Sequence, residues 1–215
     1  MLRLFDVSYD ELTEILSDDL YRLRKQTFKD RLGWEVTCIN DQEFDEYDNQ
    51  NTRYILGVYN GQLVCSVRFI GVAHPNMITH TFQAFFSDVA LEVNKIESSR
   101  FFVDKDRAKR LLGDRYPISY ILFLSMINYV RHYGGEGIYT IVSRAMLTIL
   151  KRSGWQIEPL KEAWASEKER IYLVYLPTDD KSQTQLAERI NQSLQTDFSA
   201  LTSWPLALPV TKAPV

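Results

Sequence analysis

Apolar positions in the first quarter of the chain follow two different patterns. Over residues 10–30 they recur at helical spacing, which predicts one amphipathic helix. Its apolar stripe consists of Leu12, Ile15, Leu20, Leu23 and Phe28. Residues 31–51 show no such periodicity and are expected to form a long ordered loop. Loops of that length inside a domain usually carry function, so this segment is a candidate for part of a site.

The rest of the chain alternates short apolar runs with helical patterns. Two apolar runs flank Asn60-Gly61, a dipeptide that suits a type I′ turn because both of its residues tolerate positive φ, so we predict a β-hairpin. Residues 119–132 predict a helix that is apolar on most faces and therefore largely buried, with Ser119 as N-cap and Gly134-Gly135 as its stop. The further predicted elements are strands over 98–103, 137–142, 155–160 and 170–176, and helices over 105–112, 144–152 and 182–194.

This order of elements implies an α/β (α+β) fold in which helices cover both faces of a mixed sheet. The chain has 215 residues, which suits one domain, and no segment has the composition of a linker. We therefore expect a single domain over residues 1–210. The backbone through Pro205 and Pro209 is expected to be irregular, and residues 211–215 are expected to form a disordered tail.

Composition and charge narrow the class of protein. The chain is 45% hydrophobic and 25% charged, as is usual for a soluble globular protein, and its net charge of -3 argues against a nucleic-acid binder. Asp6 and Asp10 interrupt any signal-peptide core, and no apolar run is long enough to span a membrane. We expect a cytoplasmic protein with no membrane contact, in which Cys38 and Cys65 are reduced thiols.

Three kinds of catalytic chemistry lack their sequence motifs. His74, His80 and His132 show neither zinc-ligand spacing nor nearby cysteines, so no metal site is expected. No G-x-S-x-G motif is present, which argues against a serine hydrolase. The glycines at 134–137 precede a predicted strand, where they indicate a helix stop and turn rather than a phosphate-binding loop.

The most distinctive polar chemistry lies in two short stretches and one residue between them. The first stretch contains Arg24, Phe28, Trp34, Asp45 and Asp48; the second reads Glu97-Ser98-Ser99-Arg100-Phe101-Phe102-Val103-Asp104, and Arg68 lies between them at the end of a predicted strand. In order and spacing these residues resemble the signature of the acyl-homoserine-lactone synthases, the enzymes that make bacterial quorum-sensing signals. Residues 137–150 and 153–155 also resemble family members, so the resemblance covers essentially the whole chain.

The resemblance implies a reaction and its partners. These enzymes join S-adenosylmethionine (SAM) to an acyl chain carried as a thioester on acyl carrier protein. The methionyl amine attacks the thioester, and its carboxylate then closes on its own γ-carbon and expels methylthioadenosine. SAM is a substrate, so no cofactor is implied. The fold implied is a mostly antiparallel sheet flanked by helices, like that of the Gcn5-related N-acetyltransferases.

The resemblance places Arg24, Phe28, Trp34, Asp45, Asp48 and Arg68 in the SAM pocket. SAM carries a sulfonium, an ammonium and a carboxylate, so its site needs carboxylates, an arginine and an aromatic face. Arg24 can fork onto a carboxylate or hold one of the aspartates in place. Trp34 offers a ring face that attracts a cation. On the residues alone, a solvated acidic loop with Trp34 in the core remains an alternative.

We expect Glu97, Ser99 and Arg100 to be the catalytic residues, with Glu97 as the general base. A buried carboxylate has a raised pKa and can accept the proton of the attacking amine. Arg100 would lie on the opposite face of a regular strand, so a bulge is needed to bring both residues to one side. Such a bulge could also free a backbone N–H for the thioester oxyanion. The alternative is a surface ion pair at a strand edge.

The acyl chain requires an apolar tunnel. The candidate residues are Phe101, Phe123, Met126, Thr140, Val142, Met146, Ile149, Leu150, Trp155 and Leu176, and all except Thr140 would serve equally as plain core. Thr140 places a hydroxyl in an otherwise apolar strand, where a 3-oxo group of the substrate would be a partner. In the family, a threonine at the matching position accompanies 3-oxo products. A hydrogen bond from Thr140 to the backbone is the alternative, and Ser99 could serve like Thr140.

Acyl carrier protein is acidic, so its docking face should be basic. Arg144, Lys151 and Arg152 lie on one predicted helix and are the candidates, with Lys161 and Lys168 beyond them. The helix dipole alone also favours lysine and arginine near a helix end.

Two rival functions remain open at this point. One is a coenzyme-A-dependent N-acetyltransferase, but residues 103–109 after the central strand contain no glycine, whereas those enzymes bind pyrophosphate with a glycine-containing loop. The other rival is a small-ligand-binding module without catalysis.

Overall fold

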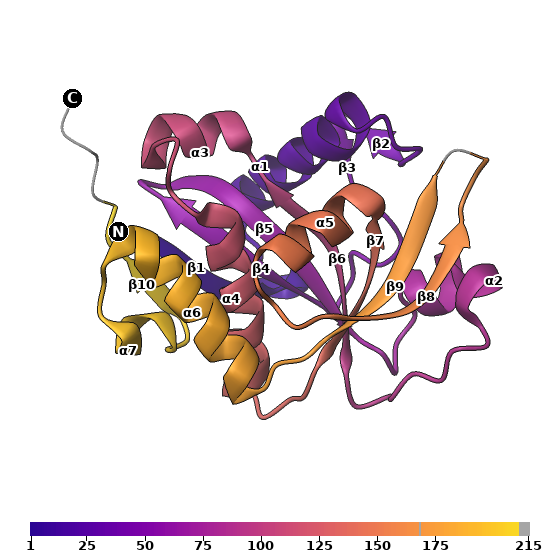
Figure 1. Cartoon of the computed structure of the whole chain (residues 1–215). Helices are drawn as coiled ribbons and strands as arrows, with labels where there is room; N and C mark the ends of the chain where they lie inside the picture. Colours follow the sequence, from indigo (N-terminus) through magenta and orange to yellow (C-terminus); the bar gives the residue numbers. More distant parts are fainter. Residues whose placement is uncertain (168, 211–215) are drawn as a thin grey trace.

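One eight-stranded sheet forms the framework of the molecule (Figure 1). The computed structural model describes residues 1–167 and 169–210, and within them the strand order is β10-β1-β4-β5-β6-β7-β9-β8. Neighbouring strands are antiparallel except β6 and β7, which are parallel. The strands are β1 (Leu2–Ser8), β4 (Thr52–Tyr59), β5 (Gln62–Gly71), β6 (Ile96–Val103), β7 (Ile138–Ser143), β8 (Glu158–Trp164), β9 (Arg170–Leu176) and β10 (Leu206–Leu208). The prediction of a mixed, mostly antiparallel sheet is confirmed.

Helices cover both faces of this sheet. On one face, α4, α5 and α6 pack with α3 and α7 in a single apolar cluster. On the other face, α1 packs against β4 and β5, and η3 with α2 packs against β7 and β9. The helices are η1 (Tyr9–Glu11), α1 (Glu14–Arg24), η2 (Lys25–Arg31), η3 (Met77–Thr81), α2 (Gln83–Phe86), α3 (Lys105–Leu112), α4 (Ile118–His132), α5 (Arg144–Arg152), α6 (Asp180–Leu194) and α7 (Phe198–Leu201).

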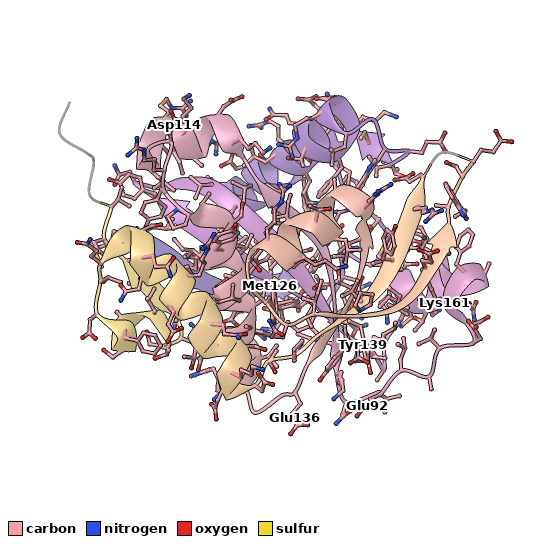
Figure 2. All side chains as sticks on the ribbon, in the orientation of Figure 1. Glu92, Asp114, Met126, Glu136, Tyr139 and Lys161 are labelled. Atoms are coloured by element: carbon pink, nitrogen blue, oxygen red, sulfur yellow. The ribbon has the colours of Figure 1, made fainter. Side chains whose placement is uncertain are left out.

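Helix α4 forms the centre of the larger core, because most of its faces are apolar and buried. Its Met126 is 2% exposed and lies in the middle of the molecule, whereas the labelled acids Glu92, Asp114 and Glu136 lie at the periphery (Figure 2). No helix among the described residues is long and apolar enough to cross a membrane.

Helix boundaries follow the local capping chemistry. Thr13 accepts a hydrogen bond from the backbone of Leu16 and begins α1, so the helix predicted over 10–30 starts later than expected. Its final part, η2, is a π-helix. Pro117, rather than Ser119, precedes α4, because proline lacks the N–H that a first helical turn leaves unpaired.

Several sheet edges differ from the sequence-based expectation. β1 and β10 were not predicted, and they pair with each other, so the segment after Pro205 is not irregular. β8 begins at Glu158, later than the predicted 155–160, because Trp155 is buried in the core instead. Residues 38–43, within the expected loop, hold a two-stranded ribbon of β2 (Cys38–Ile39) and β3 (Gln42–Glu43). The tail expected to be disordered, 211–215, lies outside the described residues.

The predicted β4–β5 hairpin is confirmed, and its packing explains why a glycine occupies position 57. Asn60 and Gly61 have φ of 49° and 73°, as the predicted turn requires. On β4, a Cβ added to Gly57 would lie 2.3 Å from the sulfur of Cys65 on β5. Cys65 is fully buried, so its side chain has no free space to move into. Gly57 is therefore required by the packing of Cys65.

Strand β6 contains a bulge at the place where chemistry was predicted. Ser66 of β5 pairs with Phe102, and Arg68 pairs with Ser99, so Val67 alone faces Arg100 and Phe101. Arg100 has a φ of 53°, in the left-handed region. The predicted bulge is therefore present, and it re-aims Arg100. The parallel pairing of β6 with β7 spans only Ile96 to Ser98, so beyond that point the two strands no longer pair.

We expect Gly57→Ala to lower the free energy of unfolding by about 1–3 kcal/mol, because overpacking a core displaces its neighbours. The double variant Gly57→Ala/Cys65→Ala removes the sulfur that the new methyl group would meet, and should be no less stable than Cys65→Ala alone. Urea denaturation of the three variants measures this. Additive losses in the double variant would contradict the assigned contact.

Candidate active site

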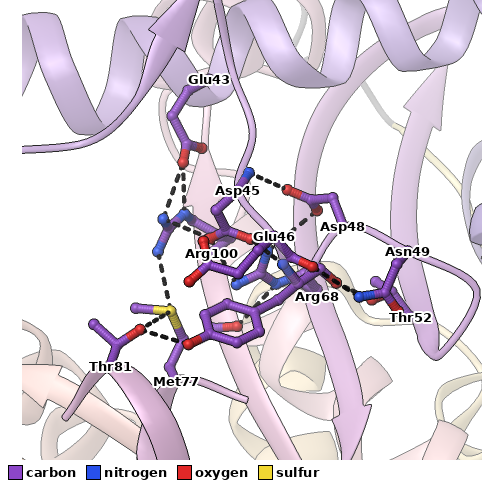
Figure 3. Close-up of polar contacts among 12 residues, drawn as sticks. Glu43, Asp45, Glu46, Asp48, Asn49, Thr52, Arg68, Met77, Thr81 and Arg100 are labelled. Atoms are coloured by element: carbon purple, nitrogen blue, oxygen red, sulfur yellow. Dashed lines mark hydrogen bonds and ion pairs between the residues drawn. The ribbon is translucent and has the colours of Figure 1, made fainter. Parts of the chain in front are cut away.

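Three arginines and three carboxylates form one buried network on the α1 face of the sheet. Figure 3 shows Arg68 and Arg100 with the carboxylates. Arg24 comes from α1, Arg68 from β5 and Arg100 from β6. Glu43 is the last residue of β3, and Asp45 and Asp48 lie in the short segment between β3 and β4. The network therefore joins a helix, two central strands and one loop.

Arg24 holds two of the carboxylates. Its Nε donates to Glu43 Oε2 at 2.6 Å, and its two terminal nitrogens donate to the two oxygens of Asp48 at 2.8 and 2.9 Å. Such a two-pronged pairing fixes both distance and orientation. Of the two roles considered for Arg24, the structure shows the one in which it holds an aspartate in place.

Arg68 and Arg100 share the third carboxylate. Arg68 donates to Asp45 at 2.5 and 3.1 Å, while Arg100 Nη2 donates to Asp45 Oδ2 and to Glu43 Oε1, each at 2.9 Å. Glu43 therefore bridges Arg24 and Arg100. The positive φ of Arg100 at the bulge turns its guanidinium to this side.

These ion pairs keep the buried acids ionised. Burial opposes ionisation of Glu43, yet Arg24 and Arg100 outweigh it and lower the pKa of this carboxyl. Burial likewise opposes ionisation of Asp48, and Arg24 with Arg68 outweighs it and holds the pKa of Asp48 well below its usual range. The alternative of a solvated acidic loop is wrong for Glu43 and Asp48, which are buried within the network.

An aromatic wall lies beside the network. Phe28 stacks on Trp34 at 5.2 Å between ring centroids, and the guanidinium carbon of Arg100 lies 5.6 Å from the Phe28 ring. Phe102 meets Phe28 edge-on at 6.5 Å. All six residues predicted for the SAM pocket are thus brought together. Of these two stacked rings, the one that lies against a guanidinium group in the described structure is Phe28 rather than Trp34.

Glu97 differs from the other acids of the site because no arginine in the described part of the chain forms an ion pair with it. It is 1% exposed; its Oε2 accepts a hydrogen bond from Ser99 at 3.2 Å, and its Oε1 has no partner among the described residues. Burial raises the pKa of Glu97 to about 7, although Arg68, Ser99 and Arg100 act in the opposite direction. The alternative of a surface ion pair at a strand edge is therefore wrong for Glu97.

Ser99 connects Glu97 to the network. Its hydroxyl accepts from Arg68 Nε at 3.1 Å and donates to Glu97. The three residues predicted as catalytic therefore lie on one side of β6, as the bulge hypothesis required. The arrangement can accept a proton at Glu97 and hold an anion near Arg100.

Most of the predicted acyl-chain residues lie on the opposite face of the sheet. Phe101 stacks on Phe123 at 4.9 Å, and Phe123 lies 5.9 Å from Trp155. Met126, Val142, Met146, Leu150 and Leu176 belong to the same apolar cluster. Ile149 is 41% exposed on α5, so its prediction as a tunnel residue is wrong: it lies on the outer face of the helix.

Thr140 is buried, and its hydroxyl is already engaged. It donates to the backbone carbonyl of Ser98 at 2.9 Å, across the last paired position of β6 and β7. This is the backbone bond that was the alternative to a substrate contact.

The predicted docking residues line the outside of α5. Arg144, Lys151 and Arg152 are exposed, and none of them makes an ion pair within residues 1–167 and 169–210. Lys161 pairs with Asp88 at 2.5 Å, so it is less available to a partner. Lys168 lies outside the described residues.

Sequence reasoning missed Glu43 as a site residue. It is fully buried and bridges two arginines, although it belongs to the same acidic run as Asp45. The signal available was its position two residues before Asp45, which was read only as part of that run. In the described part of the chain, no group of three or more histidine, cysteine or acidic side chains is placed to hold a metal ion.

Comparison with known proteins gives a consistent match. The family model described as autoinducer synthase matches residues 8–186. An acyl-homoserine-lactone synthase of Yersinia ruckeri is 68% identical over 98% of both chains, and one of Enterobacter agglomerans is 66% identical, again over 98% of both.

Solved structures match the fold. BjaI, a CoA-dependent acyl-homoserine lactone synthase solved with SAM and isopentyl-CoA, aligns with a TM-score of 0.76 at 20% identity, covering 89% of this chain and 90% of BjaI. An acyl-CoA N-acyltransferase from Pseudomonas aeruginosa aligns with a TM-score of 0.50 at 12% identity, covering 82% and 99% of the two chains. The fold is thus that of the N-acyltransferases. On the family match and the identity to curated relatives, the chain belongs to the autoinducer synthase family, the acyltransferases that make acyl-homoserine lactones.

Proposed function

We propose that this enzyme transfers an acyl group from a thioester on acyl carrier protein to the amine of SAM, and that the product closes to an N-acyl-homoserine lactone. The observation that carries the proposal is Glu97: a buried carboxyl with one unpartnered oxygen, beside an arginine network that offers it no ion pair. Methylthioadenosine is the second product.

Glu97 acts as the base in the first step. The amine nitrogen attacks the thioester carbonyl and Glu97 Oε1 accepts the amine proton. The carbon–sulfur bond then breaks, and Glu97 returns the proton to the departing thiolate, so that the free carrier thiol leaves and the carboxylate is restored. A pKa of about 7 suits this role, because the carboxyl is both available as a base and able to hold the proton at neutral pH. In the second step the methionyl carboxylate attacks its own γ-carbon and the sulfonium leaves as a neutral thioether, so the step needs no further reactant.

Arg100 is the group we assign to the carboxylate of SAM. Its Nε and Nη2 are paired with Glu43 and Asp45, but Nη1 contacts only the sulfur of Met77, at 4.0 Å, among the described residues. The nitrogens of Arg24 and Arg68 are already bonded to Glu43, Asp48, Asp45 and Ser99. Arg100 thus retains a charged donor for an incoming carboxylate. Phe28 and Trp34 provide the aromatic face for the sulfonium.

A carrier-protein donor is supported by the start of α3. Coenzyme A would place a pyrophosphate near the helix that follows the central strand. Here that end is occupied by a carboxylate, because Asp104 accepts a hydrogen bond from the backbone N–H of Arg107 at 3.0 Å. The exposed basic residues of α5 provide a face for an acidic carrier. BjaI is CoA-dependent, but its likeness to this chain concerns the fold.

The acyl chain is proposed to be 3-oxo-substituted and short to medium in length. Thr140 holds a hydroxyl beside the apolar cluster of Phe123 and Met126. To donate to a 3-oxo group, that hydroxyl must exchange its bond to the Ser98 carbonyl for the bond to the substrate. The hydrogen bond to the 3-oxo group therefore has to be at least as favourable as the existing hydrogen bond from Thr140 to Ser98.

We expect Glu97→Gln to lower lactone formation by about 100-fold or more, because glutamine keeps the shape of the side chain but cannot accept the proton. Mass spectrometry of medium from bacteria that express each protein measures the product, and its mass also reports chain length and the 3-oxo group. A variant that folds and retains the wild-type rate contradicts the proposed base. A product without the 3-oxo group contradicts the role of Thr140 alone.

The Glu97 carboxyl should titrate with a midpoint near 7 in the free enzyme. Because the pKa is raised, the carboxyl is protonated and inactive as a base below this midpoint, and the rate should rise as the pH increases through it. ¹³C NMR of the labelled carboxyl, assigned by its loss in Glu97→Gln, measures the titration. A midpoint near the ordinary glutamate value of about 4.3 contradicts it.

Charge reversal on α5 should weaken binding of the carrier-bound acyl donor and leave binding of a coenzyme A thioester unchanged. We expect Arg144→Glu or Lys151→Glu to raise KM for acyl carrier protein thioester severalfold, and to leave KM for a coenzyme A thioester of the same acyl chain unchanged. Lys181→Glu on α6 is the matched control, since it reverses an exposed charge on another helix. Equal effects of the three variants, or a preference of the wild type for the coenzyme A thioester, contradict the assignment.

A further inference from the structure

Six residues around the arginine network form a closed ring of side-chain contacts. Asp45 joins Arg68 to Arg100 through its two oxygens. The ring continues from Arg100 Nη1 to the Met77 sulfur at 4.0 Å, and from that sulfur to the Thr81 hydroxyl at 3.8 Å. The Thr81 and Tyr47 hydroxyls are 2.8 Å apart, and the Arg68 guanidinium carbon lies 5.7 Å from the centre of the Tyr47 ring, which closes the ring. Figure 3 shows these contacts.

The backbone of Tyr47 is hydrogen-bonded within the acidic segment, residues 43–48, and to Thr52 just after it. Its ring is 4% exposed, its backbone N–H donates to Asp45 Oδ1 at 3.0 Å, and its carbonyl accepts from the hydroxyl of Thr52. Burial raises the pKa of Tyr47, so the phenol keeps its proton at neutral pH. The Thr81 hydroxyl donates to Met77, which leaves its oxygen free to accept from Tyr47.

Thr81 belongs to a different part of the chain. It lies at the end of η3, in the segment that connects β5 to β6, and its side chain is exposed. The hydrogen bond between Tyr47 and Thr81 therefore links the β5–β6 segment to the segment that carries Glu43, Asp45 and Asp48. A hollow of about 550 Å³ opens at the link, lined by Glu46, Tyr47, Asn49, Pro75, His80 and Thr81.

We propose that Tyr47 and Thr81 are a positioning pair for the amine substrate: their hydroxyl contact fixes Met77 and the acidic segment on either side of Arg100, so that Arg100 Nη1 is held where it meets the substrate carboxylate. The inference rests on the proposed function, because it assumes SAM as the ligand of Arg100. Neither residue touches the reacting atoms, so both act through Arg68, Asp45 and Arg100.

This role differs from simple structural support. A hydroxyl contact at an exposed threonine contributes little to the core, and removal of one hydroxyl leaves the Tyr47 ring on Arg68 intact. The ion pairs of Asp45 and Arg100 are also unchanged by that removal. The expected loss is one of orientation, which should appear in the affinity for SAM more than in the rate of the bound complex.

The test measures KM for SAM, KM for the acyl donor and kcat in Tyr47→Phe, Thr81→Val and their double variant. We expect KM for SAM to rise about fivefold in each single variant, as the loss of one hydrogen bond predicts, with KM for the acyl donor unchanged and kcat changed less than KM for SAM. The double variant should be no worse than either single one, because both remove the same contact. Thr81→Ser keeps the hydroxyl and should restore the wild-type KM.

Tyr116→Phe is the matched control, since Tyr116 also loses one tyrosine hydrogen bond, to the Pro209 carbonyl at 3.0 Å, far along the chain from the site. It should leave KM for SAM unchanged. A wild-type KM in Tyr47→Phe and Thr81→Val, additive effects in the double variant, or an equal effect of Tyr116→Phe overturns the positioning pair while the proposed function stands. A wild-type enzyme that makes no lactone from SAM overturns both.

Discussion

The buried pairing of three guanidinium groups with three carboxylates is the constraint on which the active site depends. A charged group taken out of water is costly unless it is paired and hydrogen-bonded, and removal of one partner from a buried pair costs about 3–5 kcal/mol because the other charge is left unpaired. Arg24, Arg68 and Arg100 each contact two of the carboxylates. A shift of the helix, strands or loop that separates any of these pairs would therefore leave a buried charge uncompensated.

The same pairing explains why Glu97 can be different. All three neighbouring acids pair with the arginines, whereas Glu97 forms its one side-chain hydrogen bond within residues 1–167 and 169–210 with Ser99. Burial then dominates its titration and raises its pKa. An additional arginine contact at Glu97 would lower that pKa, and the proposed base would then no longer titrate near neutral pH. The network thus holds its arginines and carboxylates in place and leaves the Glu97 carboxyl outside the ion pairs.

The sequence predicted the features that depend on local chemistry. The Asn60-Gly61 turn, helix α3 and most of the strands and helices follow from preferences that act over a few residues. The family signature identified the charged residues, and the need to bring Glu97 and Arg100 together predicted the bulge. Glu43 and the strand β10 were missed because their roles depend on partners far along the chain. Ile149 was misplaced because an apolar residue on an amphipathic helix does not always face inward.

The bulge in β6 has a consequence for how such enzymes diversify. Arg100 is directed to the charged side of the sheet, and the next residue, Phe101, is directed to the apolar side against Phe123. The amine substrate and the acyl chain of the proposed reaction would then be recognised on opposite faces of one strand. Substitutions that reshape the apolar side, and with it the acyl chain of the signal, can then accumulate without changing the charged residues to which the reaction is assigned here.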